Sequence, residues 1–106
     1  MYKILITRPL PSKIHQKANG LGDVTTRSKT TSMSEQEMIS ALQDYDIVVP
    51  TLGDVFSASI FLQVENPRCR LLANFGVGYN HIDVNKAKKK GIMVTNTPGA
   101  VTDATA

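Results

Sequence analysis

The stretch Asp46-Ile47-Val48-Val49-Pro50 decides the fold class of this sequence. Its apolar residues follow one another without the polar alternation expected of a strand that has one face in water. An unbroken apolar run of this length is typical of a strand that is covered on both faces, as in a parallel sheet. We therefore expect residues 46–50 to form an inner strand with helices on both sides.

Similar strand-like runs stand on either side of this stretch. We expect the other strands at residues 3–7, 24–26, 71–75 and 92–96, the second of these being the weakest. Helical patterns separate them, at residues 13–19, from Ser34 to near Tyr45, from Ser57 to Asn66-Pro67, and from Asp83 to Lys90. This alternation predicts an α/β domain, a parallel sheet with right-handed crossovers and helices on both faces.

Capping residues indicate where the expected helices begin. Ser34 followed by Glu37 is a capping box, and Asp83 has the character of an N-cap. Ser12 and Ser57 are expected to cap the first and third helices. The apolar side chains expected to face the core from the second and third helices are Met38, Ile39, Leu42, Ile60, Phe61 and Val64.

Composition and charge exclude several classes of protein. The 106 residues are 42% hydrophobic and 20% charged, and the formal net charge of +3 does not by itself indicate nucleic acid. The basic run at residues 86–90 falls at an expected helix end, where cations are favoured, so we interpret it as solvated rather than as a nucleic-acid patch. No signal peptide or membrane-spanning run is visible. We expect a cytoplasmic protein without a nucleic-acid or membrane partner.

Three side chains are weighed for reactivity. Cys69 lies between two arginines, which could lower a thiol pKa, but no histidine is close in sequence. We interpret it as a passive residue at the start of a strand rather than a nucleophile. His81 stands beside a glycine loop, where a general-base role competes with the structural role that we favour. His15 lies on a polar helix and is expected to be solvated.

Two chemistries known on this topology are excluded by the residues at the strand ends. Acidic residues such as Asp54 suggest a phosphoacceptor domain, but that chemistry needs an aspartate at the end of the third strand, where Val49 and Pro50 stand. A flavin site would want a phosphate loop after the first strand, and residues 7–11 lack its glycines and hydroxyls. Metal-ligand spacing is missing as well, and we assign no metal ligand.

The most informative loop is Gly76-Val77-Gly78, at the end of the fourth expected strand. Ligands of open α/β sheets bind at the carboxyl ends of the strands, where residues 7–11, 51–54 and 76–80 fall. Two glycines around one residue allow consecutive backbone N–H groups to form an anion nest. The alternative is a glycine-rich turn without a ligand. A dinucleotide fingerprint is not favoured, because its third glycine is replaced by His81 and its strand is not the first.

The last third of the chain resembles the D-isomer-specific 2-hydroxyacid dehydrogenase family. Residues 74–83 are similar to its substrate-loop motif, and residues 91–99 to the strand and turn that precede its interdomain helix. Residues 101–106 resemble the opening of that helix, and residues 7–11 the start of the glyoxylate/hydroxypyruvate reductase branch. The resemblance implies a flavodoxin-like α/β substrate-binding domain over residues 1–100, followed by the start of the interdomain helix.

The resemblance also implies where a substrate and a cofactor would be bound. The carboxylate of a 2-oxo acid would meet the backbone amides of Val77 and Gly78, in the loop that Gly76 opens. Leu52 and Gly53 would line the same pocket, and Thr105 would lie near NAD or NADP. The family binds that cofactor mainly through a nucleotide-binding domain, which is absent from this chain along with the catalytic arginine, glutamate and histidine. No catalytic residue is therefore assigned here.

The implied full-length protein is an NAD(P)-dependent 2-hydroxyacid dehydrogenase. It would reduce a small 2-oxo acid such as glyoxylate or hydroxypyruvate by hydride transfer, and it would be a homodimer. The 106-residue chain alone is expected to be inactive. The alternative is a stand-alone module, without catalysis, that binds a small acid or another protein.

Overall fold

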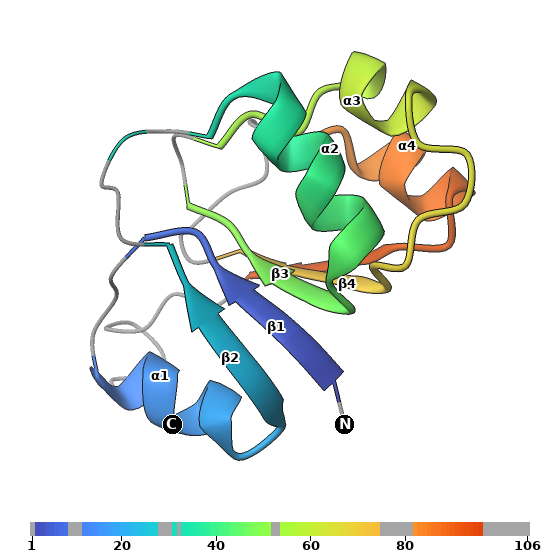
Figure 1. The fold of residues 1–106 in the computed structure, drawn as a ribbon. Helices are drawn as coiled ribbons and strands as arrows, with labels where there is room; N and C mark the ends of the chain where they lie inside the picture. The colour runs from blue at the N-terminus through green and yellow to red at the C-terminus, as the bar shows by residue number, and fades with distance from the viewer. Residues whose placement is uncertain are drawn as a thin grey trace.

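A parallel sheet of five strands forms the middle layer of the protein (Figure 1). The computed structural model describes residues 2–8, 12–27, 31, 33–51, 54–74 and 82–96. The strands are β1 (Tyr2–Ile6), β2 (Gly22–Thr26), β3 (Ile47–Val49), β4 (Leu71–Asn74) and β5 (Met93–Asn96). Their order, β2-β1-β3-β4-β5 with every pair parallel, confirms the predicted flavodoxin-like α/β fold.

Helices cover the two faces of the sheet unequally. They are α1 (Ser12–Asn19), α2 (Glu35–Asp44), α3 (Ala58–Leu62) and α4 (Val84–Lys89). Figure 1 shows α1 on one face, beneath β2, and α2, α3 and α4 together on the other. Within the described ranges, none of these helices has the length and apolar character needed to cross a membrane.

Local sequence signals explain the ends of two helices. The hydroxyl of Ser34 accepts the Glu37 N–H at 3.2 Å, and the Glu37 carboxylate accepts the Ser34 N–H at 3.0 Å, which completes the predicted capping box of α2. The Asp83 carboxylate caps α4 by accepting the Lys86 N–H at 3.0 Å. Gly91 ends α4 with a φ of 79°, a left-handed conformation that suits glycine.

Two predictions about helix ends are wrong, and a third holds only in part. Ser12 is the first residue of α1 rather than its cap. Ser57 does stand at the N-cap position of α3, but its side chain makes no capping hydrogen bond. The Ser57 hydroxyl instead lies 3.0 Å from the hydroxyl of Ser59. Helix α3 also ends earlier than expected, at Leu62, because the N–H of Val64 bonds to the carbonyl three residues back at 3.2 Å and so tightens the last turn.

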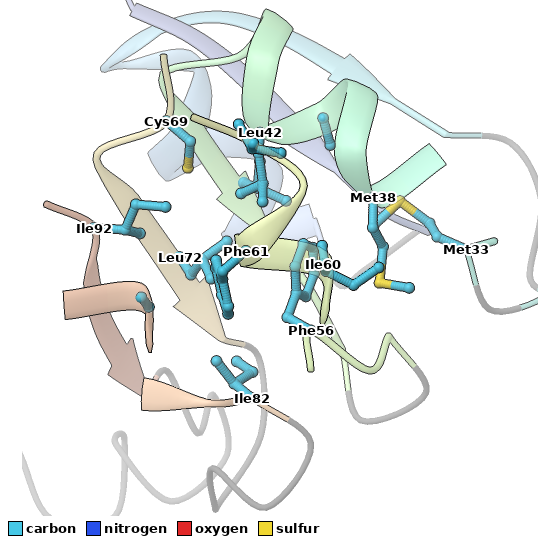
Figure 2. Close-up of a cluster of buried hydrophobic side chains, with 14 of the residues drawn as sticks. Met33, Met38, Leu42, Phe56, Ile60, Phe61, Cys69, Leu72, Ile82 and Ile92 are labelled. Atoms are coloured by element: carbon cyan, nitrogen blue, oxygen red, sulfur yellow. The ribbon is translucent and has the colours of Figure 1, made fainter. Parts of the chain in front are cut away.

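The main hydrophobic core lies between the sheet and α2, α3 and α4 (Figure 2). Figure 2 shows side chains of α2 and α3 converging with Leu72 of β4 and with Ile82 and Ile92. The predicted core residues Met38, Leu42, Ile60, Phe61 and Val64 are all buried there, and Ile39 is partly buried against them. A smaller cluster of Ile4, Ile6, Ala18 and Val49 lies on the α1 face.

Cys69 belongs to the main core and is fully buried. Burial raises the pKa of its thiol to about 11, because the thiolate would lose its hydration there. A thiol with so high a pKa is a poor nucleophile, which confirms the passive role predicted for Cys69. His15 differs from its prediction, since it is only partly exposed and its Nδ1 atom lies 3.4 Å from the Thr26 hydroxyl.

The amino edge of the sheet is held by Asp46. Its carboxylate accepts the backbone N–H of Lys3 at 2.8 Å, and the Arg68 guanidinium donates to it at 3.0 and 3.4 Å. The Arg68 hydrogen bond, followed by that of Lys3, lowers the pKa of Asp46 from its usual 3.8. These contacts join the starts of β1 and β3 to the segment that leads into β4.

The core predicts that shortening two neighbouring side chains of α3 has very different effects on stability. Phe61 is buried and its ring lies 6.2 Å from the Phe56 ring, whereas Leu62 is 62% exposed. We expect Phe61→Ala to lower the free energy of unfolding by about 3–5 kcal/mol through lost burial and a cavity. Leu62→Ala is expected to change it by less than about 0.5 kcal/mol. Urea denaturation of the purified chain measures both, and similar losses for the two variants would contradict this core.

The Asp46 contacts predict how stability depends on pH. A lowered pKa in the folded state means that ionised Asp46 stabilises the fold above about pH 4, and that this contribution is lost as the pH falls through the folded-state value. We expect Asp46→Asn to reduce stability above about pH 5 and to differ less from the wild type as the pH falls towards 3. Denaturation curves across this range check it, and a difference that does not vary with pH would contradict it.

Candidate functional site

The carboxyl edge of the sheet contains the point at which the strand order reverses. The connection after β1 leads to α1 on one face, whereas the connection after β3 leads to α3 on the other face (Figure 1). Because β1 and β3 are neighbours and the helices that follow them lie on opposite faces, this strand pair is the switch point of the sheet. Ligands of open α/β sheets bind at such a switch point, so this edge is the candidate site.

Asp54 lies at this switch point and is fully buried. Its Oδ2 atom accepts the Thr7 hydroxyl at 2.6 Å and the Thr51 N–H at 2.9 Å, with the Thr51 hydroxyl at 3.3 Å. Its Oδ1 atom accepts the Met33 N–H at 3.1 Å. Thr7 follows β1, Thr51 follows β3, and Met33 precedes α2. One carboxylate therefore joins three segments that are far apart in the sequence.

The end of β1 is held by a second polar group, the side chain of Arg27. Its guanidinium donates to the carboxylate of Glu37 at 2.8 and 3.0 Å, and to the backbone carbonyl of Thr7 at 3.4 Å. Because the Thr7 hydroxyl donates to Asp54, both the side chain and the carbonyl of Thr7 are engaged. The backbone N–H of Thr7 also bonds to the Val49 carbonyl at 3.3 Å. The first strand thus ends in a fixed position.

Arg8 brings a cationic group to the same edge, directly after Thr7. Within the described part of the chain, its Nε atom is buried and has no hydrogen-bond partner. A buried donor without a protein partner indicates a position for an anion or a water molecule. The end of β1 therefore combines a hydroxyl bound to Asp54 with a buried guanidinium N–H that has no partner among the described residues.

The segments that follow the loops after β3 and β4 lie side by side. Phe56 and Ile82 form a parallel β-bridge, and the Asp83 N–H bonds to the Phe56 carbonyl at 2.8 Å. Phe56 follows the first of these loops and Ile82 follows the second. The bridge therefore brings together the chain segments that leave the two loops, on the side of the sheet covered by α3 and α4.

The predicted site residues lie outside the described residues. They are Leu52, Gly53, Gly76, Val77, Gly78 and Thr105, and His81 lies outside as well. The structure does describe the residues next to two of these segments, Thr51 and Asp54 around positions 52 and 53, and Asn74 and Ile82 around positions 75–81. The predictions for the individual site residues stay predictions.

The role of Asp54 is the feature that the sequence analysis missed. The sequence suggests Asp54 as a phosphoacceptor, which Val49 and Pro50 exclude, and otherwise places it only within the candidate ligand loop at residues 51–54. The Asp54 N–H bonds to the Thr51 carbonyl three residues back at 2.9 Å, which is the hydrogen bond of a β-turn and is local in sequence. The contact with Thr7, however, spans 47 positions in the sequence, and no local pattern predicts it.

Comparison with known proteins agrees with this architecture. The model of the catalytic domain of D-isomer specific 2-hydroxyacid dehydrogenase matches residues 4–106. The chain is 34% identical over 104 residues to a glyoxylate reductase of Thermococcus kodakarensis, an alignment that covers 98% of this chain and 31% of that protein. The chain thus spans about a third of the length of the relatives it matches.

Two solved structures extend the comparison to three dimensions. A protein from Polaromonas sp. JS6 66 superposes with a TM-score of 0.81 at 23% identity, over 98% of this chain and 32% of that one, which shows the fold. An acyclic imino acid reductase, in complex with NADPH and D-Arg, superposes with a TM-score of 0.75 at 28% identity, over 91% of this chain and 31% of that one.

Proposed function

This chain belongs to the D-isomer specific 2-hydroxyacid dehydrogenase family, and on that premise we propose that it is the substrate-binding part of an NAD(P)-dependent oxidoreductase. The full-length enzyme would reduce a small 2-oxo acid, such as glyoxylate or hydroxypyruvate, to the 2-hydroxy acid by hydride transfer. The observation that carries the choice of substrate is the 34% identity to a glyoxylate reductase along nearly the whole chain.

In this proposal the carboxyl edge of the sheet binds the carboxylate of the substrate. The backbone amides of Val77 and Gly78 would donate to it, because Gly76 and Gly78 allow consecutive N–H groups to converge on one anion. Leu52 and Gly53 would line the same pocket. The switch point between β1 and β3 and the Phe56–Ile82 bridge support this assignment, since they bring the flanking segments of both loops to one edge.

Charge at this edge also supports an acidic ligand. Arg8 stands at the end of β1 with a buried N–H that has no partner among the described residues. A guanidinium in such a position attracts a carboxylate and strengthens its hydrogen bonds. Backbone amides and a guanidinium together suit a small mono-anion better than a neutral ligand.

The cofactor would supply the hydride, and this chain would orient the acid for its transfer. The connection after β1 has Pro9 and Pro11 in place of a glycine-rich phosphate loop. It does not fit a dinucleotide, so we expect NAD or NADP to be held mainly by a second domain, with Thr105 near it. A homodimer in the cytoplasm, with neither nucleic acid nor membrane as a partner, completes the proposal.

The first test concerns the full-length protein. Reading the gene beyond codon 106 should show an open frame with a strand followed by G-x-G-x-x-G, whereas a stop codon would support a stand-alone binding module. We expect the purified full-length enzyme to oxidise NADH or NADPH in the presence of glyoxylate or hydroxypyruvate. Loss of reduced-nicotinamide absorbance measures this reaction, and no loss with either acid and either cofactor would contradict the proposal.

The second test concerns the chain alone. We expect the 106-residue chain to be folded by circular dichroism and to show no turnover of glyoxylate with NADPH, because the hydride donor has no phosphate loop to hold it. The full-length protein, assayed in parallel, is the positive control. Sustained turnover by the folded chain alone would show that the catalytic groups lie within these residues.

A further inference from the structure

We propose that Asp54 is a positioning residue for the substrate site, which holds the ends of β1 and β3 in the arrangement that the acid requires. This inference rests on the proposed function of the carboxyl edge. Asp54 does not touch the substrate in this proposal. It acts through Thr51, whose backbone it binds and which stands directly before Leu52 and Gly53.

The hydrogen bonds of Asp54 are the first support. In the described part of the chain, its carboxylate accepts the backbone N–H groups of Thr51 and Met33 and the hydroxyls of Thr7 and Thr51, at 2.6–3.3 Å. A buried carboxylate is stable only when such donors replace its hydration. Because the donors come from three separate segments, the charge is satisfied only while these segments keep their relative positions.

The rigidity of its partners is the second support. Met33 is anchored by its own side chain in the main core, where Figure 2 shows it beside Met38. Thr7 is held by the Val49 carbonyl and by Arg27 in addition to Asp54. Asp54 therefore joins Thr51 to the segments of Thr7 and Met33, which other contacts already hold in place. These two segments restrain the end of β3.

The place of Asp54 in the chain is the third support. Asp54 N–H bonds back to the Thr51 carbonyl at 2.9 Å, while its carboxylate accepts the Thr51 N–H at 2.9 Å. Both backbone groups of Thr51 are thus bound by the residue that follows positions 52 and 53. The two residues expected to line the pocket are enclosed between these contacts, at the switch point where a ligand of this fold binds.

Asp46 provides a matched comparison within the same sheet. It too is an aspartate that joins β1 to β3, but it lies at the amino edge and pairs with the exposed Arg68. Asp46 therefore holds the amino edge of the sheet, whereas Asp54 holds the carboxyl edge, where the acid is proposed to bind. Only a change at Asp54 should affect binding of the acid.

The experiment measures steady-state kinetics of the full-length enzyme with glyoxylate and NADPH for Asp54→Asn. The amide keeps the shape of the side chain but turns one acceptor oxygen into a donor, which then faces an N–H group. We expect the KM for glyoxylate to rise about tenfold, the equivalent of one lost hydrogen bond, with kcat and the KM for NADPH within about twofold. The effect falls on KM because the carboxylate of glyoxylate keeps its charge throughout the reaction. The site therefore binds it equally well in the ground state and in the transition state.

Two controls separate positioning from stability. Asp46→Asn should lower the unfolding temperature and leave the KM for glyoxylate within about twofold of the wild type. Thr7→Val removes the 2.6 Å hydrogen bond to Asp54 and should raise the KM for glyoxylate by about threefold to tenfold. Thr7→Ser keeps the hydroxyl, so its KM for glyoxylate should equal that of the wild type. The Thr7 pair answers the question even where Asp54→Asn fails to fold.

Three results would overturn the inference. These are a wild-type KM in a folded Asp54→Asn enzyme, an equal rise of KM in Asp46→Asn, and a KM for Thr7→Ser as high as that for Thr7→Val. Each would make Asp54 a structural residue while leaving the proposed function in place. A wild-type enzyme that reduces neither glyoxylate nor hydroxypyruvate would instead overturn the proposed function, and this inference with it.

Discussion

The pairing of β1 with β3 is the constraint on which the rest of the structure depends. Residues 4–6 pair with residues 47–49, although the chain has formed β2 on the other side of β1 in between. Right-handed crossovers then require α1 and α2 to lie on opposite faces of the sheet, as Figure 1 shows. This pair is the switch point of the sheet, and we place the acid at its carboxyl edge. A fold with the strands in sequential order would cover one face only and would have no such switch point.

The two aspartates at opposite ends of this strand pair satisfy their charge in different ways. Asp46 is partly exposed and bound by a guanidinium, so its charge is stabilised by a cation and by water. Asp54 is fully buried and surrounded by neutral donors. Breaking a buried set of this kind leaves several polar groups unsatisfied at once, so its geometry is kept more strictly than that of an exposed ion pair.

The covering of the sheet also differs between its two faces. Three helices pack on the face that contains the main core, and its fully buried side chains include both aromatic rings of the Phe56–Phe61 pair. The other face has the small cluster around Ile4 and Ile6, covered by α1 alone among the described elements. Met93, in the edge strand β5, is 66% exposed. The chain spans about a third of the length of the relatives that it matches.

The sequence by itself determined the elements and their order. Unbroken apolar runs such as residues 46–50 identified the inner strands, and the Ser34–Glu37 capping box and Asp83 placed two helix starts, because these signals act between near neighbours. The helix expected from the apolar pattern after Ser57 is longer than α3, because the tightened last turn depends on hydrogen bonds that this pattern does not specify. The glycine loop after β4 was identified as a candidate site, but its residues lie outside those described here.

Only the tertiary structure decided which distant groups meet at the carboxyl edge. The four donors around Asp54 come from positions 7, 33 and 51, and the contact with Thr7, 47 positions away, exists only because β1 and β3 pair. A carboxylate in a loop reads from sequence as a solvated or reactive group. Burial makes it instead a fixed acceptor that joins three segments, because a charge without water must be satisfied by whatever the fold places beside it.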